Sequence, residues 1–437
     1  MSIRTLEALL AAFRDAGATQ VLCKRLAEND NSKQQIYLGN SFESLNLLPF
    51  GAMEQSKGIA RPNLKAPIQL GWMDMEGRIE PARGAQLILY PDYPEVRLSG
   101  FLRGCANAPA VLMRPIPRES RRFDNEPDGR LLFLALHPER RLIAHAVGAA
   151  SPIAREFDDY IARNPPVRRG VFLDIPIGRR DTRSELLVRL REIHRAGWHE
   201  SRRLDREGRA LPYVARNGAG YTLEALLGIT PNARALPDFL GWEVKACGRD
   251  RVTLMTPEPD SGYYGQHGVE AFVRRFGHDA GRDTLYFTGQ HRTGVRCAAT
   301  GQRLILRGFD AQSGRITNIN GGIYLITDDD MDSAGWSFRR LLEHWGRKHA
   351  AAAYVPYESG TGLVPRYRYN SPASLGEGTE FARFLLALAD GVIVFDPGSK
   401  VMNASRQAGK VKARSQFRIS KKYLPRLYAR FQDESLN

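Results

Sequence analysis

The pattern of apolar residues changes near residue 180, and this change constrains the fold more than any other feature of the chain. Before it, apolar or alternating runs of strand length are separated by clusters of Pro and Gly. After it, segments with a period near 3.6 alternate with short strand-like runs. The segment VRRGVFLDIPIGRRD interrupts both patterns with Gly, Pro and charges, so it is a plausible join. Because 437 residues exceed the usual size of one domain, we predict two domains, at residues 1–178 and 179–437.

The first half is predicted to be mainly β. Its opening segment, MSIRTLEALLAAFRDAG, has the apolar spacing of an amphipathic helix. The runs predicted to form strands are QQIYLG, AQLILY, EVRLSGFL, LLFLAL and LIAHAVG. This succession of short strands favours an all-β barrel or pseudobarrel over alternating strands and helices. Residues 106–178 carry little signal and are expected either to complete the barrel or to form an extra layer.

The second half is predicted to have an α/β fold. Its predicted helices lie in TRSELLVRLREIHRAGW, YTLEALLGI, GVEAFVRRFG and SFRRLLEHWGRKHA. Predicted strands are GWEVKAC, RVTLMT and a final strand, GVIVFDPG, which precedes a basic tail. The mixture of both element types indicates a domain in which helices cover a sheet.

The chain is strongly basic, with 63 Lys and Arg against 48 Asp and Glu and a net charge of +15. Such a surface favours polyanionic partners, of which nucleic acid is the commonest. The cysteines are few and widely spaced, which excludes a zinc finger and favours reduced thiols over disulfides. The opening segment lacks a signal-peptide core, and no apolar run has the length of a membrane span. We therefore expect a cytoplasmic protein with no membrane partner.

Four residues between positions 220 and 248 form the most informative group. Glu224 lies in a predicted helix, Asp238 follows a Pro before a tight turn, and Glu243 and Lys245 alternate on the next strand. Strand residues two apart share a face, so Glu243 and Lys245 are expected to share a site that Asp238 approaches across the turn. Two carboxylates suit Mg²⁺, and a neighbouring amine can orient or deprotonate a water. Phosphodiester hydrolysis needs these parts.

The order of Glu, then Pro-Asp-Phe, then Glu-x-Lys resembles the PD-(D/E)xK nucleases. With its setting of GWHESRR and GAGYTLEALLGI, the region from about residue 183 onward is similar to the MvaI/BcnI restriction endonucleases and to the mismatch-repair nuclease MutH. The resemblance implies that Asp238 and Glu243 hold Mg²⁺, that Lys245 acts on the water and that Glu224 supports the metal site. No residue of this group departs from the expected types, so the resemblance implies an active enzyme.

Two basic segments are candidates for DNA contact. Residues 400–430 contain ten Lys or Arg and no acidic residue, which is typical of a surface that faces phosphates. Within this tail, GKVKARSQFRIS resembles the place where the MvaI/BcnI family reads the major groove, and Arg414, Gln416 and Arg418 alternate there as base or phosphate ligands. In VPRYRYNSP, Arg366 and Arg368 alternate with Tyr in a loop-forming context, although an exposed strand edge is the other interpretation.

The segment VLCKRLAENDNSKQQIYLG resembles the start of the effector-binding domain of EcoRII, a pseudobarrel akin to plant B-three DNA-binding domains. That fold grips DNA with two arms. The resemblance places one arm at Lys24, Arg25, Asn29, Asp30, Asn31, Lys33 and Gln34, and the other at Arg97 and Ser99 of YPEVRLSGFLRG. A polar hairpin and an ordinary edge strand are the simpler interpretation.

These features together favour a Mg²⁺-dependent type II restriction endonuclease of the IIE kind. Its amino-terminal domain would bind a second copy of the target in double-stranded DNA, and a cognate DNA methyltransferase would belong to the same system without forming a stable complex. One alternative is a modification-dependent endonuclease whose amino-terminal domain reads modified DNA. A DNA-binding regulator without catalysis would gain nothing from carboxylates placed near phosphates. A mismatch-repair nicking protein would not need the extra domain.

Overall fold

The computed structural model describes residues 2–31, 34–39, 44–56, 62–90, 95–122, 126–175, 177, 182–215, 217–230, 239–248, 250–348, 351–360, 362 and 364–437. The chain forms two compact units, Met1–Asp181 and Thr182–Asn437. The first unit ends at the last residue of the segment interpreted from the sequence as a join. Each unit is described by itself below.

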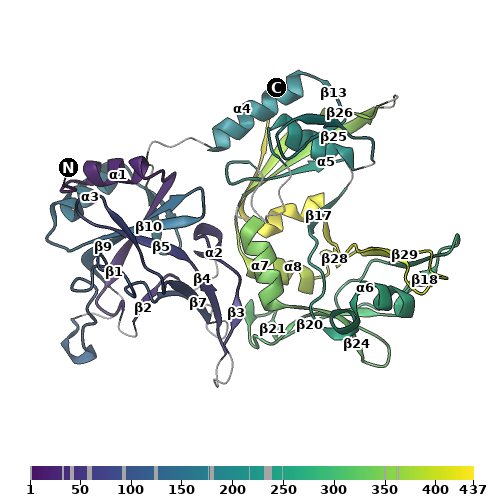
Figure 1. Ribbon diagram of the computed structural model, residues 1–437, viewed down its shortest axis with the longest axis horizontal. Coiled ribbons are helices and arrows are strands. Elements are labelled where there is room, and N and C mark those ends of the chain that lie inside the picture. Colours follow the sequence, from purple (N-terminus) through teal and green to yellow (C-terminus); the bar gives the residue numbers. More distant parts are fainter. Residues whose placement is uncertain are drawn as a thin grey trace. The chain divides into compact units, whose positions relative to one another are not determined.

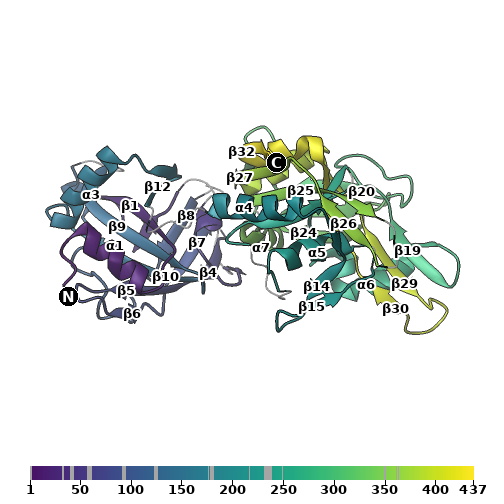
Figure 2. The ribbon, with the colours of Figure 1, turned by 90° about the horizontal axis from the view of Figure 1, so that it is seen from above.

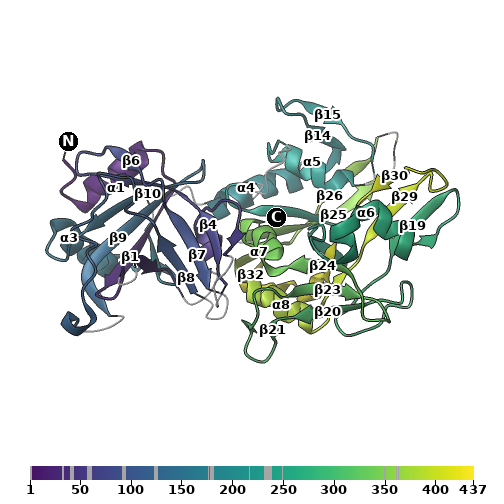
Figure 3. The same ribbon diagram turned by 60° about the horizontal axis from the view of Figure 1, so that its bottom comes forward.

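The first unit contains two sheets and two substantial helices (Figure 1). Its helices are α1 (Leu6–Asp15), α2 (Ser44–Leu47), α3 (Pro152–Arg163) and the short 3-10 helix η1 (Arg118–Ser120). Its strands are β1 (Gln20–Ala27), β2 (Gln35–Tyr37), β3 (Glu54–Gln55), β4 (Leu64–Pro67), β5 (Gln69–Met73), β6 (Ile79–Pro81), β7 (Gln86–Tyr90), β8 (Glu95–Ser99), β9 (Pro127–His137), β10 (Arg141–Val147), β11 (Val167–Arg169) and β12 (Phe172–Ile175). The 7-stranded sheet has the order β11-β12-β1-β9-β10-β5-β6, and the 5-stranded sheet has the order β2-β8-β7-β4-β3 (Figure 3).

Helices α1 and α3 cover one face of the seven-stranded sheet. Alternate strand residues, such as Val21 and Cys23 of β1, join the apolar sides of both helices in one buried cluster. The residue between them, Leu22, is also fully buried, so the sheet is covered on its other face as well. The sequence analysis expected α1 but not α3, although Ser151 caps α3 by accepting from Ala154 N at 3.2 Å. The first unit is therefore a mixed α/β structure with a large β content, and its closure into a pseudobarrel stays a prediction.

The second unit is a larger α/β structure. Its helices are α4 (Thr182–Arg195), α5 (Gly218–Leu226), α6 (Gly262–Phe276), α7 (Phe338–Lys348), α8 (Phe381–Ala389) and the 3-10 helix η2 (Lys421–Leu427). Its strands are β13 (Trp198–Glu200), β14 (Arg202–Leu204), β15 (Ala210–Pro212), β16 (Glu243–Cys247), β17 (Arg251–Met255), β18 (His278–Asp279), β19 (Thr284–Thr288), β20 (Arg303–Arg307), β21 (Phe309–Asp310), β22 (Arg315–Ile316), β23 (Gly322–Ile326), β24 (Asp332–Ser337), β25 (Ala351–Gly360), β26 (Arg366–Tyr369), β27 (Ala373–Thr379), β28 (Ile393–Phe395), β29 (Gly398–Met402), β30 (Lys410–Lys412), β31 (Phe417–Ser420) and β32 (Tyr428–Glu434).

The main sheet of this unit has the order β13-β26-β25-β27-β32, and β16 pairs in parallel with β25. Helices α4 and α5 pack on one face of it (Figure 2), where Leu190 and Leu223 meet Val244 of β16 and Val355 of β25 in one buried cluster. Because strand side chains alternate, the residues on either side of Val244 point away from these helices. One face of β16 thus packs against α4 and α5, and the other carries Glu243, Lys245 and Cys247.

Smaller sheets complete the second unit, with the orders β17-β31-β28, β18-β19-β29-β30 and β20-β23-β24. The prediction that GVIVFDPG is the final strand was wrong, because β29, β30, β31 and β32 follow it. The basic tail is therefore built into these sheets and into the edge of the main sheet. These short strands alternate basic with apolar residues, so the sequence was interpreted as a basic tail and the strands were not predicted.

His291 is a buried histidine, and its burial leads us to expect that the stability of the second unit depends on pH. Its Nε2 lies 2.8 Å from Thr300 Oγ1, its ring stacks on Phe287, and burial lowers its pKa to about 4 from an ordinary 6.5. The unfolded chain binds a proton below pH 6.5, whereas the folded chain does not bind it until about pH 4. The contribution of neutral His291 to the free energy of unfolding is therefore fully present above pH 6.5 and is lost as the pH falls toward 4. We expect a loss of about 2 kcal/mol between about pH 7 and pH 4.5.

Denaturant unfolding of the full chain across this pH range measures the effect. His291→Gln, whose side chain does not titrate, serves as the control, and the difference in slope between the two proteins isolates the histidine. Identical pH dependence in both would contradict the assignment.

Two further expectations concern the described part of the chain. None of its helices is long and apolar enough to span a membrane. Its four cysteines are free, as their spacing predicted.

Candidate active site

The outward face of β16 carries the acid and the amine that the sequence paired. Glu243 is the first residue of the strand and Lys245 follows two positions later, so both point away from the helices packed on Val244. Lys245 Nζ donates to Glu243 Oε1 at 2.7 Å. Glu243 is only 4% exposed, whereas the Lys245 side chain keeps 17% of its surface accessible. A nearly buried carboxylate is therefore held beside an amine that solvent can reach.

The turn that leads into β16 is tight. Phe239 and Trp242 exchange two backbone hydrogen bonds, at 2.9 and 2.8 Å, across Leu240 and Gly241. Both of the central residues have positive φ, 48° and 89°, and Gly241 adopts this region without the strain that a side chain brings. Trp242 packs in the same core as Val244, which fixes the register of the strand start. Asp238, the predicted metal ligand just before this turn, lies outside the described residues.

A tyrosine pair lies next to this face, and the sequence analysis missed it. Tyr354 of β25 is the direct parallel partner of Lys245, so the two side chains lie on the same face of the sheet. Its hydroxyl is 2.7 Å from the hydroxyl of Tyr428 on β32. Burial raises the pKa of both phenols, and the Glu243 carboxylate raises each pKa further. Both hydroxyls therefore stay protonated at neutral pH, and they supply a polar support close to Glu243.

Close backbone approach makes this tyrosine pair possible. A side-chain carbon on Gly376 would lie 2.6 Å from the ring of Tyr428, so only glycine leaves room for that ring. Cys247 follows on the same face of β16, and burial raises the pKa of its thiol to about 11. A thiol of this kind remains protonated and does not act as a nucleophile at neutral pH.

Glu224 lies on α5, as predicted, and is half-buried. This helix packs through Ala219 and Leu223 on the opposite face of the sheet from Glu243. The Glu224 carboxylate is one of the groups that raise the pKa of the buried Tyr369, after burial and two neighbouring tyrosines. Its predicted support of a metal site stays a prediction.

The donor set suits a hard divalent cation. Glu243 offers carboxylate oxygens at a nearly buried position, and Lys245 stands where it can hold a water or a phosphate oxygen. Among the described residues, no group of three or more His, Cys, Asp or Glu side chains gathers in metal-binding geometry. A site at Glu243 would therefore draw its second carboxylate from outside those residues, where Asp238 lies, or complete its shell with water and phosphate oxygens.

The predicted row in the basic tail shares one face of the chain. The intervening Ser415, Phe417 and Ile419 are buried, whereas Arg414 is exposed and Gln416 and Arg418 are half-buried. Two hydrogen bonds to the segment Asp396–Ser399 hold this row in place. Arg414 N donates to the Ser399 side chain at Oγ (3.0 Å), and Asp396 N donates to Gln416 O (2.8 Å). Arg418 also donates to Asp396 Oδ2 at 2.7 Å.

Arg366 and Arg368 lie on β26, so the expected loop around them is a strand instead. This strand is not at an edge of its sheet, because it pairs with both β13 and β25. Tyr367 and Tyr369 point into the core, and the two arginines are exposed on the other face. Tyr alternating with Arg is thus the signature of a half-buried strand here. Arg366 lies 3.6 Å from Glu200, and Arg368 is paired in register with Trp198.

In the first unit, the structure corrects the role expected of Lys24. Its side chain is buried, and Nζ donates to Asp30 Oδ2 and to Arg25 O. Asp30 in turn accepts from the backbone of Ala27 and Tyr37, at 2.9 and 3.1 Å. This buried ion pair therefore stabilises the turn that follows β1. The Lys24 ammonium does not face outward to contact DNA.

The other residues of the predicted first arm have mixed positions. Asn31 is buried and donates to Met113 O, so it supports the turn as well. Arg25 forms an ion pair with Asp158 and lies 5.7 Å from the Phe157 ring. Gln34 is exposed and Asn29 is half-buried, whereas Lys33 lies outside the described residues.

The second predicted arm lies on β8, and its neighbouring strand β2 begins directly after Gln34, the last residue of the predicted first arm. Gln35 of β2 pairs with Ser99 of β8, and Tyr37 pairs with Arg97. Arg97 forms hydrogen bonds to Glu95 at 2.7 and 2.9 Å and lies 5.5 Å from the ring of Tyr90. Arg97 and Ser99 therefore lie beside Gln35 and Tyr37 on one half-buried polar face of the five-stranded sheet, whereas Lys24 and Arg25 of the predicted first arm lie on β1 of the seven-stranded sheet.

Comparisons with known proteins point to the second unit. The profile of the MvaI/BcnI restriction endonuclease family matches residues 187–428. The solved complex of restriction endonuclease MvaI with its cognate DNA substrate is 18% identical, with a TM-score of 0.46, over 59% of this chain and 99% of that one. MvaI in the absence of DNA is 16% identical, with a TM-score of 0.33, over 59% of this chain and 98% of that one. No curated protein matches the chain at a significant level. Because the family profile spans more than half of the chain, including the strand with Glu243 and Lys245, this protein belongs to the MvaI/BcnI restriction endonuclease family.

Proposed function

We propose that the second unit is a Mg²⁺-dependent type II endonuclease that hydrolyses the backbone of duplex DNA at a specific sequence. The observation that carries this proposal is the Glu243–Lys245 pair, with Nζ and Oε1 2.7 Å apart on the face of β16 that points away from α4 and α5. Glu243, together with Asp238, would hold the ion, and Glu224 would support that site as the resemblance implies. A bound Mg²⁺ would supply Lewis acidity and neutralise the charge that develops on the cleaved phosphate.

Lys245 would act on the attacking water in this scheme. Its ammonium can accept no proton, so it serves either by holding and polarising the water or, once neutral, by removing its proton. The tyrosine pair of Tyr354 and Tyr428 would keep the floor of the site fixed, because both hydroxyls are buried and bonded to each other. Asp238, Glu243 and Lys245 would together form the PD-(D/E)xK arrangement.

Sequence recognition would fall to the row formed by Arg414, Gln416 and Arg418. These side chains follow one another on one face, as a reader of successive base pairs requires, and Arg and Gln match the acceptor and donor patterns of guanine and adenine. Arg366 and Arg368 are exposed on β26 and would add contacts to the duplex.

We further propose that the first unit is an EcoRII-like effector domain that binds a second copy of the target, as in type IIE enzymes. Support comes from the polar face on β2 and β8, where Arg97 and Ser99 lie beside Gln35. A DNA methyltransferase of the same specificity would protect the host genome.

Arg97→Ala tests this role of the first unit. The guanidinium lies among Glu95, Gln35 and Tyr90, and its side chain keeps 26% of its surface accessible, so the loss should act on ligand binding more than on folding. We expect effector binding by the full chain to weaken by about tenfold, while cleavage of DNA with one site proceeds at its basal rate. Stimulation of cleavage by added target duplex measures it. Full stimulation of the variant would contradict the assignment.

One experiment separates the proposed enzyme from its nearest alternative. The full chain is incubated with methylated and unmethylated genomic DNA in Mg²⁺, and the new ends are sequenced. Ends at one short sequence in unmethylated DNA are the expected result. Cleavage of modified DNA alone would indicate a modification-dependent endonuclease, and intact DNA in both samples would contradict the nuclease assignment.

A further inference from the structure

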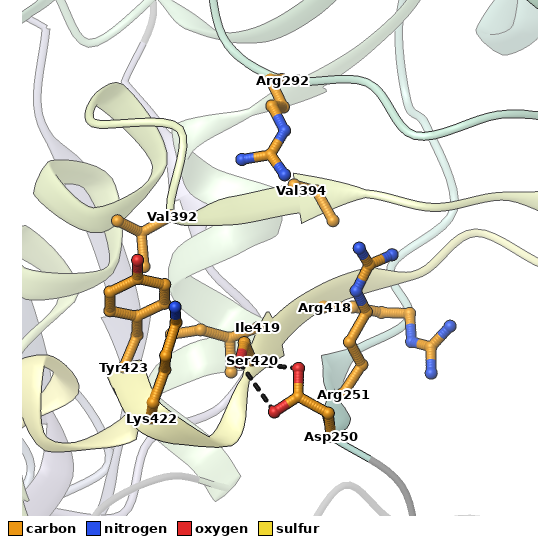
Figure 4. Close-up of a pocket in the computed structure, with 10 residues that line it drawn as sticks. All are labelled: Asp250, Arg251, Arg292, Val392, Val394, Arg418, Ile419, Ser420, Lys422 and Tyr423. Atoms are coloured by element: carbon orange, nitrogen blue, oxygen red, sulfur yellow. Dashed lines mark hydrogen bonds between the residues drawn. The ribbon is translucent and has the colours of Figure 1, made fainter.

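A small cavity in the second unit is lined by four cationic side chains. Its volume is about 240 Å³, and strands β17, β28 and β31 with helix η2 and the segment at Arg292 enclose it (Figure 4). The lining residues are Asp250, Arg251, Arg292, Val392, Val394, Arg418, Ile419, Ser420, Lys422 and Tyr423. Four cations and one carboxylate line this space, and Asp396 pairs with one of the cations, so the cavity has an excess of positive charge.

The donors in the cavity are only partly used by the protein. The one carboxylate, Asp250, already accepts from the Ser420 hydroxyl at 2.8 and 2.9 Å. Arg292 donates one hydrogen bond to Gly391 O at 3.1 Å, and Arg418 donates one to Asp396 Oδ2 at 2.7 Å. Arg418 Nε is buried without a hydrogen-bond partner in the part of the chain that the structure describes. Buried donors and clustered like charges are both costly, and an anion would relieve both.

Apolar groups share the cavity with these cations. Val392, Val394 and Ile419 line it, and Tyr423 is 37% exposed at its rim with Lys422 Nζ 4.8 Å from its ring. A free inorganic anion needs only the charged groups. A phosphate that carries a sugar on each side also gains from the apolar wall, so the lining fits a phosphodiester better.

The cavity lies close along the chain to the proposed active site. Asp250 and Arg251 follow β16, and Lys421 ties η2 to its end by donating to Cys247 O at 2.9 Å. Arg251 comes eight positions after Glu243, and a fully extended chain of eight residues spans at most about 29 Å. Duplex DNA advances about 3.4 Å for each base pair, so this reach corresponds to at most about eight base pairs.

We propose that this cavity binds one backbone phosphate of the DNA substrate, a few nucleotides from the cleaved bond. The inference rests on the proposed function, and it deepens that function by assigning Arg251, Arg292 and Lys422 to phosphate binding. It also assigns Arg418, at the end of the row, to phosphate, and leaves base reading to Arg414 and Gln416. Phosphate contacts of this kind fix the position of the duplex and carry no sequence information themselves.

Charge-removing variants of the full chain test the proposal by DNA binding in EDTA, where no cleavage occurs. Arg251→Gln and Arg292→Gln keep most of each side chain. Arg189→Gln removes the same charge at an exposed position of α4 that does not line the cavity, and it serves as the control. The dissociation constant is measured at several salt concentrations, both for a random duplex and for the site found by end sequencing. In the double variant, which carries both cavity substitutions, we expect affinity to fall roughly tenfold for both duplexes. The slope of log affinity against log salt concentration should become shallower by about one, as expected for the loss of one phosphate contact.

Phosphate ethylation locates the contact. In the wild type, ethylation of one phosphate near the cleaved bond should interfere with binding, and this interference should disappear in the double cavity variant but persist in Arg189→Gln. Wild-type affinity and slope in the cavity variant would overturn the inference. So would saturable binding of inorganic phosphate to the wild type together with an unchanged DNA slope in the variant, because the cavity would then be a free-anion site. A wild-type protein without DNA affinity would instead overturn the proposed function.

Discussion

Replacing Lys245 with alanine is expected to lower the rate of DNA cleavage by about a thousandfold while DNA affinity changes little. The amine lies 2.7 Å from Glu243 and keeps part of its surface accessible, so it is placed to hold a water beside the carboxylate. Its removal would take away the group proposed to activate this water, and it would leave the basic surfaces of the chain intact. Single-turnover cleavage of DNA that carries one site measures the rate, and binding in EDTA measures affinity.

Lys245→Arg provides the matched control, because it keeps the charge but not the compact amine. If the amine itself acts on water, this variant should be almost as slow as the alanine variant. Recovery of the wild-type rate in Lys245→Arg would reduce the role of Lys245 to charge alone. Wild-type cleavage by Lys245→Ala would remove the residue from the active site.

Glu243→Gln is expected to lose cleavage to a similar extent, by a different route that metal dependence reveals. The carboxylate is a hard-oxygen ligand, whereas the amide that replaces it binds Mg²⁺ weakly. In EDTA this variant should bind DNA more tightly than the wild type, because one negative charge near the phosphates is gone. Ca²⁺, which binds carboxylates, should tighten DNA binding by the wild type and have little effect on the variant.

Anisotropy titrations in EDTA and in Ca²⁺ measure these changes, and circular dichroism checks that the variant is folded. Removing the carboxylate also deprives Lys245 of its partner, so a modest loss of stability is expected alongside the loss of rate. Equal responses of both proteins to Ca²⁺ would show that Glu243 does not hold the ion.

The sequence predicted the strand of the site because its signal is local. GWEVKAC alternates an apolar set with Glu243 and Lys245, and the structure places β16 at Glu243–Cys247 with both side chains on the face away from α4 and α5. The sequence did not reveal Tyr354 and Tyr428. They reach this face through parallel pairing of β16 with β25 and antiparallel pairing of β27 with β32, which join strands distant in the chain. Such pairings depend on long-range packing, and no nearby residue encodes them.

Two of the expectations that failed did so because the surroundings of a residue were inferred from its type. Lys24 was assigned to a DNA-binding arm, but Asp30, six residues later, draws its ammonium into the interior. The segment around Arg366 was expected to form a loop, but Tyr367 and Tyr369 fill the core and make it a strand. In both cases buried side chains determine where the basic residues lie. The order of charges along the sequence does not indicate which side chains are buried.

A crystal structure of the full chain with its target duplex and with Ca²⁺ in place of Mg²⁺ would test the central claim most directly. We expect one ion that contacts carboxylate oxygens of both Glu243 and Asp238 and an oxygen of a single phosphate, with Lys245 Nζ within hydrogen-bond reach of a water beside it. An ion held elsewhere, or a duplex whose nearest phosphate lies away from β16, would contradict the account.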